Sequence, residues 1–248
     1  MAAPCTARAI AIFALAAGCG GSWSASFPMG VTADSKLSVS AYKGTVRLRE
    51  SRSGQIEVVV RGKAPVPLDQ AVAFTIVAEP DGPGRHLAVV PAAMDAELDL
   101  EVAAPAGIRL YCSCSAADVQ VSGAWSLLRV VTAGTIDARV DATAGSLRSQ
   151  RGDVRLDARG AGPTGELRAE STSGNVSVTL PARWTGQLKF RTQTGKLDVP
   201  THKGLQTIWD ENLKGVVGRL GGRREEDGPL PTVWGVSGTG NVLFRVGE

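Results

Sequence analysis

Between Gly134 and Val199 the chain reads GTIDARVDATAGSLRSQRGDVRLDARGAGPTGELRAESTSGNVSVTLPARWTGQLKFRTQTGKLDV. One phrase recurs in this stretch: a glycine, a polar residue, an apolar residue, a polar residue and a second apolar residue. Its copies begin at Gly134, Gly145, Gly152, Gly165, Gly174, Gly186 and Gly195. Alternation of apolar and polar residues is typical of β-strands with one buried face. The stretch therefore predicts short strands separated by glycine turns.

The spacing of the copies predicts how the strands are arranged. Every second copy follows at 18, 20, 22, 21 and 21 residues. A period of about 20 residues with two strands is typical of stacked coils, because one coil cannot bury its apolar face alone. The expected fold class is all-β, a β-solenoid of two-strand coils without large helical content. Glycine is expected to supply the positive φ of each sharp corner.

Alternation also assigns the two faces of each strand. The residues expected to face the core are Ile136, Ala138, Val154, Leu156, Leu167, Ala169, Val176, Val178, Leu188, Phe190, Leu197 and Val199. If alternate copies stack, one outward column holds Asp137, Arg155, Ser177 and Asp198, and the next holds Arg139, Asp157 and Thr179. Opposite charges then lie on adjacent strands, which favours a structural ladder over a catalytic carboxylate pair.

The other sheet is expected to carry a basic column of Arg148, Arg168 and Lys189. Like charges on adjacent strands lower stability unless they are offset, and Glu166 and Glu170 lie close enough to offset part of this repulsion. Two interpretations remain open. The column is either a solvated basic face or a stripe that binds an anionic ligand, such as phosphate or an anionic polysaccharide.

Residues 1–18 have the features of a signal peptide. Arg8 supplies a basic region, and residues 9–17 form an apolar run too short to span a bilayer. The run leads to Leu15-Ala16-Ala17-Gly18-Cys19, which resembles the lipobox of bacterial lipoproteins, where the cysteine is acylated. We expect a lipid on Cys19; cleavage near Ala25 and a retained anchor are the alternatives. Gly20 in place of an aspartate favours, by analogy with such lipoproteins, the outer membrane.

The remaining chain divides by composition. Residues 19–35 are small and polar and are expected to be a flexible tether. Residues 36–248 are expected to form a single domain, with a less regular part at 36–104, regular repeats at 105–199, and a C-terminal loop and closing strands at 200–248. Residues 200–214 are the one helix or loop candidate. Residues 36–61 and 233–246 are the candidates for capping the two ends.

Apart from Cys5 in the signal segment and Cys19, which is expected to carry the lipid, the chain has two cysteines, Cys112 and Cys114. They share the parity of Ile108 and Leu110, so both thiols are expected to line the core. Burial as small apolar groups, a strained disulfide and a metal site are the alternatives. The tryptophans are expected to be core or capping residues, with sugar stacking as the alternative: Trp125, Trp184, Trp209 and Trp234.

Composition argues against several classes of function. The net charge of +3 is too small to indicate nucleic-acid binding, and 5% aromatic residues argue against stacking platforms for sugars. The only histidines, His86 and His202, lie in unrelated segments, which gives a Ser-His-Asp triad little support. No P-loop or dinucleotide fingerprint is present. We therefore predict no catalytic residues, no cofactor and no metal.

Short motifs give the chain a resemblance to a known family. They are Ala104-Pro105-Ala106-Gly107, Thr172-Ser173-Gly174-Asn175-Val176, Thr194-Gly195-Lys196-Leu197 and Ser237-Gly238-Thr239-Gly240-Asn241-Val242. With these motifs residues 36–247 resemble the bacterial putative-adhesin family of β-strand-repeat domains, whose members have no agreed activity. The family usually shows Ser-Gly-Asp/Asn, and Ala133-Gly134-Thr135 and Ala144-Gly145-Ser146 depart from it.

The expected function follows from these features together. The resemblance implies an adhesin-like rod, and the N-terminus predicts export and a lipid anchor in the bacterial cell envelope. We expect a non-catalytic envelope lipoprotein that binds or scaffolds, with an anionic envelope polysaccharide or another envelope protein as partner. The alternatives are a carbohydrate-active β-solenoid enzyme and a periplasmic regulatory partner of a membrane signalling protein.

Overall fold

The computed structural model describes residues 14–18, 22–27, 35–63, 72–78, 85–91, 97–211, 215–221 and 229–247. These residues form a 20-stranded mixed sheet and contain no helix, so the all-β prediction is confirmed. The strands are β1 (Ala14–Gly18), β2 (Ser22–Phe27), β3 (Lys36–Ala41), β4 (Thr45–Glu50), β5 (Ile56–Lys63), β6 (Val72–Ala78), β7 (Arg85–Pro91), β8 (Glu97–Ala104), β9 (Arg109–Cys114), β10 (Asp118–Thr132), β11 (Ile136–Ser149), β12 (Val154–Ala158), β13 (Glu166–Ser171), β14 (Val176–Pro181), β15 (Gly186–Thr192), β16 (Leu197–Asp198), β17 (Leu205–Asp210), β18 (Gly215–Leu220), β19 (Thr232–Ser237) and β20 (Val242–Gly247).

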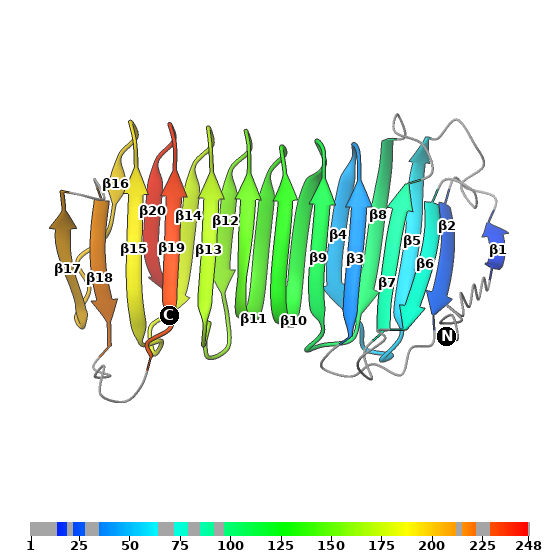
Figure 1. Ribbon diagram of the computed structural model, residues 1–248, viewed down its shortest axis with the longest axis horizontal. Coiled ribbons are helices and arrows are strands. Elements are labelled where there is room, and N and C mark those ends of the chain that lie inside the picture. Colours follow the sequence, from blue (N-terminus) through cyan, green and yellow to red (C-terminus); the bar gives the residue numbers. More distant parts are fainter. Residues whose placement is uncertain are drawn as a thin grey trace, which may run out of the picture.

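The strands pair in two rows along the length of the molecule (Figure 1). The first row runs β6-β7-β3-β9-β10-β11-β13-β19-β15-β18-β17. The second row runs β1-β2-β5-β8-β4-β10-β11-β12-β14-β20-β16. The long strands β10 and β11 belong to both rows and join them into one sheet. Pairs in the middle of each row are parallel, and antiparallel pairs lie toward the ends.

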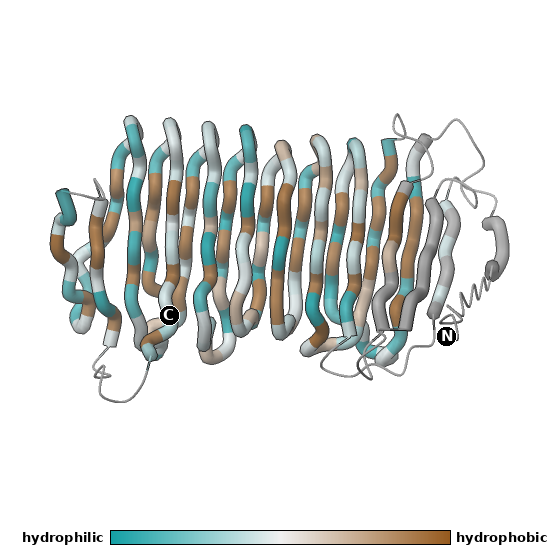
Figure 2. Tube along the Cα trace, viewed as in Figure 1, coloured by the Kyte–Doolittle hydropathy of each residue, from teal (hydrophilic) through white to brown (hydrophobic). Residues whose placement is uncertain are grey.

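The core lies between the two rows. Apolar and polar residues alternate along the strands, as the brown and teal bands of Figure 2 show. Ile136, Val154 and Val176 occupy one register on adjacent strands and are all 0% exposed. Each such burial contributes about 1.5–3 kcal/mol. Of the residues expected to face inward, all are buried except Leu197 and Val199, which are partly buried against the core.

A buried hydroxyl joins successive turns at one corner. Ser149 Oγ donates a hydrogen bond to the Gly134 carbonyl oxygen (2.7 Å) and accepts one from the Gly152 N–H (2.8 Å). The same pair of bonds is made by Thr132, Ser171, Ser237 and Thr192. Each hydroxyl therefore satisfies one backbone group of its own turn and one of the adjacent turn.

A second ladder, made by side chains that follow the glycines, runs beside the first. The backbone N–H of Asn175 donates to Asp153 Oδ1 (2.8 Å), and the N–H of Asn241 donates to Asn175 Oδ1 (2.9 Å). Asn241 Oδ1 accepts in turn from the N–H of Lys196 (2.9 Å). The recurring Ser-Gly-Asn motif thus encodes contacts between adjacent turns, and this ladder ends at Lys196, whose side chain has no acceptor.

The corner glycines are required by close approach and not by positive φ, which corrects the sequence prediction. Of the seven glycines that begin the copies, only Gly145, which lies within strand β11, has a positive φ (157°). A Cβ on Gly152 would overlap the carbonyl group of Gly134, and a Cβ on Gly174 would overlap that of Gly152. The backbones of neighbouring turns therefore pass too close for any side chain.

The C-terminal strands do not cap the array, contrary to prediction. β19 lies between β13 and β15, and β20 lies between β14 and β16. Likewise β3 lies between β7 and β9, and β4 between β8 and β10. Both predicted caps, residues 36–61 and 233–246, are therefore internal. The sequence period could not predict the internal position of these strands, because turns with the same alternating pattern can pack against one another in any order.

Two further segments differ from expectation. Within residues 200–214, expected to be helix or loop, Leu205–Asp210 forms the strand β17. Within the expected tether, Ser22–Phe27 forms β2, which pairs antiparallel with β5. The described residues contain no helix with the length and apolarity needed to cross a membrane.

Candidate functional site

The outward side of the first row is rich in cations. We call this side, over strands β3, β9, β10, β11, β13, β19 and β15, the basic face. Its outward cations are Lys36, Arg109, Arg129, Arg148, Arg168, Lys189 and Arg191, and its outward acids are Glu166 and Glu170. Alternation explains the placement, because inward and outward residues follow one another along each strand.

Trp234 lies at the C-terminal part of the basic face, between two cations. The guanidinium carbon of Arg168, on β13, is 4.7 Å from the centre of a Trp234 ring. Lys189 Nζ, on β15, is 4.5 Å from a ring centre. Because β13 and β15 flank β19, each neighbouring strand places a cation over the indole. Cation–π attraction holds both charges at fixed positions.

A second aromatic residue of the basic face repeats this arrangement. Lys36 Nζ lies 4.8 Å from the centre of the Tyr111 ring, and the guanidinium carbon of Arg129 lies 5.8 Å from it. Tyr111 and Trp234 share one outward register, which also holds Ser38, Arg129, Ser146, Arg168 and Lys189. Three cations and two aromatic rings therefore lie in a single line across the strands, and each ring has a cation of this line as a direct neighbour.

The predicted stripe of Arg148, Arg168 and Lys189 is not one column. Arg168 lies beside Ser146, and Arg148 lies beside Glu170, one step along the strands. Lys189 is separated from Arg168 by Trp234. Lys189 is displaced because β19 lies between β13 and β15, and Arg148 is displaced because β11 pairs with β13 two residues away from the predicted register. No two of the three cations are therefore direct neighbours. Binding of an anion by them stays a prediction.

The two acids hold part of the basic face in place. Arg148 Nε lies 2.9 Å from Glu170 Oε2. Arg168 Nε lies 3.3 Å from Glu166 Oε1 and 3.6 Å from Glu170 Oε1, and neither contact has the geometry of a hydrogen bond. The Arg168 guanidinium is thus held by an indole and two carboxylates while a third of its side chain stays exposed (33%).

Two shallow grooves adjoin on this face. One, of about 550 Å³, is lined by Leu127, Arg129, Val131, Ala144, Gly145, Ser146, Arg148, Glu166 and Arg168. The other, also about 550 Å³, lies across β11, β13, β19 and β15 and is lined in part by Arg148, Arg191 and Glu170. The small residues at 144–146 open the first groove between Arg129 and Arg168. Together the grooves could hold an extended ligand with several negative charges.

Sequence reasoning missed Tyr111, Arg129 and Trp234. A signal for the aromatic pair exists in the pattern, because Trp234 stands between the inward Val233 and Gly235, and Tyr111 stands between Leu110 and Cys112. A large ring at an outward position is an exception to the polar alternation. Trp125 and Trp184 are buried as expected, at 2% and 3%, whereas Trp209 is 57% exposed.

The outward side of the second row is charge-paired. Its predicted neighbours are confirmed for Asp137 with Arg155 and for Arg139 with Asp157. The recorded ion pairs run along the strands instead, from Arg139 to Asp137 (3.9 Å) and from Arg159 to Asp157 (3.0 Å). The predicted contact of Ser177 with Asp198 is wrong, because Leu243 of β20 lies between them.

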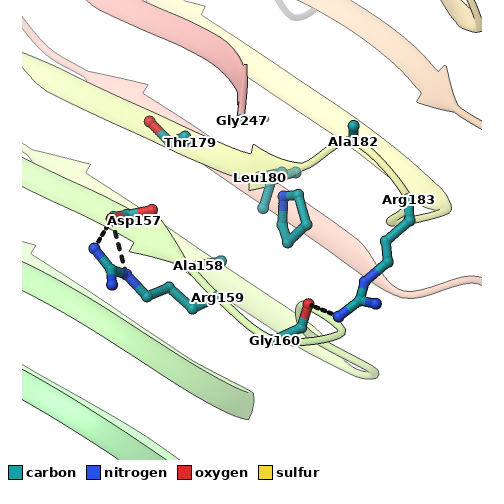
Figure 3. Close-up of a pocket in the computed structure, with 10 residues that line it drawn as sticks. Asp157, Ala158, Arg159, Gly160, Thr179, Leu180, Ala182, Arg183 and Gly247 are labelled. Atoms are coloured by element: carbon teal, nitrogen blue, oxygen red, sulfur yellow. Dashed lines mark hydrogen bonds and ion pairs between the residues drawn. The ribbon is translucent and has the colours of Figure 1, made fainter.

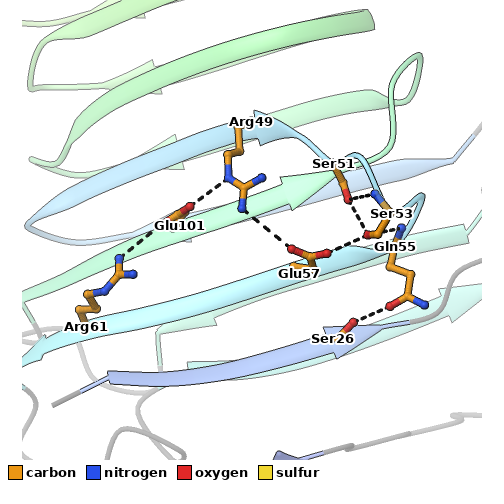
Figure 4. Close-up of polar contacts among 8 residues, drawn as sticks. All are labelled: Ser26, Arg49, Ser51, Ser53, Gln55, Glu57, Arg61 and Glu101. Carbon is orange, nitrogen blue, oxygen red and sulfur yellow. Dashed lines mark hydrogen bonds and ion pairs between the residues drawn. The ribbon is translucent and has the colours of Figure 1, made fainter. Parts of the chain in front are cut away.

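The N-terminal part of this side carries a small network, shown in Figure 4. Glu101 accepts hydrogen bonds from Arg49 Nε (2.9 Å) and Arg61 Nη1 (3.3 Å). The bond from Arg49 is the main cause that lowers the pKa of Glu101 below its ordinary value. Glu57 receives a hydrogen bond from Ser53 (2.7 Å) and faces Arg49 at 3.9 Å. These charges are neutralised within the protein, which gives this side no clear preference for an ion.

A groove of about 560 Å³ lies where β12 and β14 end (Figure 3). Its two cations are engaged with the protein. Arg159 donates two hydrogen bonds to Asp157 Oδ2 (3.0 and 3.2 Å), and Arg183 donates one to the Gly160 carbonyl oxygen (2.9 Å). The groove therefore offers a ligand less positive charge than the basic face does.

Cys112 and Cys114 line the core, as their parity predicted. They are 3% and 8% exposed, and their sulfur atoms lie 3.5 Å apart without a disulfide. The contact with Cys114, together with burial, raises the pKa of Cys112 well above its ordinary value. Across the described ranges, no group of three or more histidine, cysteine or acidic side chains is placed to hold a metal ion. The predicted lipid attachment at Cys19 lies outside the described residues.

No family model matches the chain, and a search of curated proteins gives no match. Several solved structures are similar to it, among them the following two. A "putative cell adhesion protein" from Clostridium sporogenes has a TM-score of 0.49 and 8% identity, over 91% of this chain and 100% of that chain. A "putative adhesin" from Bacteroides fragilis has a TM-score of 0.41 and 12% identity, over 91% of this chain and 96% of that chain.

Proposed function

We propose that this protein is a non-catalytic, lipid-anchored protein of the bacterial cell envelope, and that its body is a β-solenoid that binds anionic polysaccharide on the basic face. One observation carries the ligand class: the cations Arg168 and Lys189 held over Trp234 at 4.7 and 4.5 Å. The aromatic ring holds the two cations in fixed positions, and their positive charges stay accessible to solvent. Such charge suits carboxylate, sulfate or phosphate groups.

Parallel pairing supports the solenoid assignment. β11 pairs with β12 at an offset that sets Ile136 beside Val154, and β12 pairs with β14 so that Val154 lies beside Val176. The two rows enclose one core, and the hydroxyl ladder joins turn to turn at the corner. Stacked coils of this kind present identical strand spacings of about 4.8 Å along the whole body.

A polymer fits the face better than a small anion does. The cations lie on six of the seven adjacent strands, all except β19, and are separated by uncharged residues such as Ser146 and Trp234. A ligand whose negative charges recur along its length can contact several of them at once, and the contacts add. Cations already occupy the space over the indole ring, which disfavours stacking of a sugar on its face.

Retention on immobilised heparin and on immobilised polygalacturonate tests the ligand class. We expect Arg168→Glu to elute at clearly lower salt than the wild type, because the substitution replaces attraction by repulsion. Arg155→Glu on the opposite side is the matched control, since it changes net charge equally and Arg155 is also exposed. Equal elution of the two variants would remove the proposed site, and failure of the wild type to bind either matrix would remove the ligand class.

The anchor is tested separately from the ligand. Export and a lipid on Cys19 rest on Leu15-Ala16-Ala17-Gly18-Cys19. We expect palmitate to label the wild type and not Cys19→Ala, and the variant to leave the membrane fraction. Equal labelling of the two proteins would show that the lipid, if any, is attached elsewhere.

A further inference from the structure

The strand β17 lies at the C-terminal end of the first row, at the far end of the array in Figure 1. It pairs with β18 through all six of its residues, from Leu205 beside Leu220 to Asp210 beside Gly215. None of the described strands pairs with its other edge. A strand edge of this kind presents a row of backbone donors and acceptors.

Both faces of β17 expose large apolar side chains. Ile208 is 75% exposed and lies beside Val217 on the outward face. Trp209 is 57% exposed and lies beside Val216, which pairs with the core residue Phe190. The inner apolar surface of the first row therefore continues through β18 onto an exposed edge. These are the largest exposures among the large apolar residues that the structure describes.

The free edge of β17 lacks three features that prevent edge strands from pairing with another chain, namely lysine, proline and a β-bulge. Leu205–Asp210 contains no lysine and no proline, and its register with β18 has no bulge. Natural edge strands usually carry at least one of these features, because an open apolar edge recruits another strand. Both the backbone and the side chains of β17 thus favour a partner strand.

We propose that β17 is a dimer interface, in which two copies of this chain pair antiparallel about Thr207. In this register Thr207 lies opposite its own copy, and Leu205 lies opposite Trp209 of the second copy. Leu205 and Trp209 are both on the inner face of the sheet, so the apolar cores of the two copies become continuous. Lys203, exposed before the strand, lies opposite Glu211, exposed after it. The two-fold axis makes this charge pair twice.

The alternatives fit the same residues less well. Parallel pairing of two β17 strands would place Lys203 beside Lys203 and Glu211 beside Glu211, which is repulsive. It would also break the antiparallel pattern that β15, β18 and β17 already form. A two-fold pairing is closed, so it yields a dimer and not a fibre. The interface is separate from the basic face, and the dimer does not depend on any ligand.

Charge reversal tests the register. We expect the wild type to sediment as a monomer–dimer mixture at concentrations up to about 100 μM, near the Kd range of small interfaces. Glu211→Lys should weaken the dimer about tenfold, because it makes two repulsive pairs. Lys203→Glu combined with Glu211→Lys should restore the wild-type constant. Failure of the double variant to restore it would overturn the register.

Disulfide trapping tests the axis directly. Single cysteines are placed in a background with Cys5→Ser and Cys19→Ser, which leaves the two buried thiols of Cys112 and Cys114. With glutathione disulfide as oxidant, Thr207→Cys should form a covalent dimer at least tenfold faster than Gln206→Cys. The axis places the two residues 207 directly opposite each other, whereas the two residues 206 are diagonal neighbours about 7–8 Å apart.

Three results would overturn the dimer. They are a wild type that stays monomeric throughout the concentration range, equal trapping rates for residues 206 and 207, or a dimer unchanged in Ile208→Lys/Trp209→Glu. Circular dichroism and the melting temperature confirm that each variant is folded. Both substituted residues are more than half exposed, so we expect folding to be retained. Growth of long assemblies in place of a dimer would also exclude a two-fold contact.

Discussion

Ser171 Oγ donates a 2.8 Å hydrogen bond to the carbonyl oxygen of Gly152, a residue of the preceding turn. The same hydroxyl accepts the N–H of Gly174 at 2.8 Å, within its own turn. One side chain thus fixes the shape of a corner and its distance from the next corner. Both functions require a residue with one donor and one acceptor at the same atom, which a hydroxyl provides.

Ser171→Ala should lower the free energy of unfolding by about 1–3 kcal/mol, because it leaves a buried carbonyl and a buried N–H without partners. Urea denaturation measures the loss. Ser173→Ala is the matched control in the same turn, since Ser173 is exposed, and its effect should stay within about 0.5 kcal/mol. Ser171→Thr should keep most of the stability, because threonine makes the same bonds at Thr132 and Thr192. Equal losses for Ser171→Ala and Ser173→Ala would contradict the ladder.

Gly174→Ala should be far more destabilising than Gly54→Ala. A Cβ on Gly174 would overlap the Gly152 carbonyl group, whereas a Cβ on Gly54 meets no atom within 4 Å. Gly54 has a φ of 71°, so its replacement costs about 1 kcal/mol of backbone strain. We expect Gly174→Ala to cost several times more or to prevent folding. Thermal melts of the two variants check this, and similar melting temperatures would show that turns can separate easily.

Val233→Ala tests the internal position of the C-terminal strands. Val233 is 0% exposed and lies between Leu167 of β13 and Leu188 of β15. We expect a loss of about 2 kcal/mol or more, as for other fully buried apolar truncations. Val246→Ala, at the partly buried end of β20, should cost less than half of that. A negligible effect of Val233→Ala would indicate that β19 is a frayed end.

The network around Glu101 predicts a pH dependence. Because the hydrogen bond from Arg49 lowers the pKa of Glu101 in the folded state, its stabilisation is present above the ordinary value of 4.5. It is lost as the pH falls through the lower folded value. Glu101→Gln should therefore destabilise the protein by up to about 1 kcal/mol at pH 7 and by less at pH 3. An equal effect at the two pH values would assign the loss to packing.

The two buried thiols should be inert in the folded protein. Cys112 is 3% exposed, and its pKa is raised by the contact with Cys114 and by burial, so little thiolate is available for reaction. The same contact lowers the pKa of Cys114, so the inertness of Cys114 rests on its burial at 8% exposure. We expect a thiol reagent to modify Cys112 and Cys114 only at the rate of unfolding and rapidly in denaturant. Fast modification of native protein would show that strand β9 opens locally. Cys5→Ser/Cys19→Ser again removes the other thiols.

The sequence correctly predicted two properties of the fold, namely which residues of a strand face the core and which residues pair across the adjacent strands β11 and β12. Alternation identified the inward residues from Ile136 to Phe190, and the spacing of the glycines placed Asp137 beside Arg155 and Arg139 beside Asp157. Both follow from the two-residue period of a strand and from the length of one turn. The corner glycines were identified correctly, but for the wrong physical reason.

The order of the turns could not be predicted. The turn beginning near Gly240 has the same phrase as that near Gly195, and both match the turn at Gly174. Which copy lies beside Val176 depends on the path of the chain between the strands, and the repeated pattern contains no information about that path. The order of the turns also explains part of the error in the basic stripe, because Trp234 lies between Arg168 and Lys189. The rest is an error of register, since Arg148 pairs with Glu170 and not with Arg168.

The insertion of β19 and β20 also determines when the protein can finish folding. β13 and β15 share β19 as their neighbour, so their final partner is among the last residues to be synthesised. Turns cannot simply be added in the order in which the ribosome produces them. One turn of the array is missing until the ribosome has released residues 232–247. Inserting this turn joins segments that are far apart in the chain, so we expect this folding step to be slow. The export proposed above would benefit from that delay, because an exported chain must stay unfolded until it has crossed the membrane.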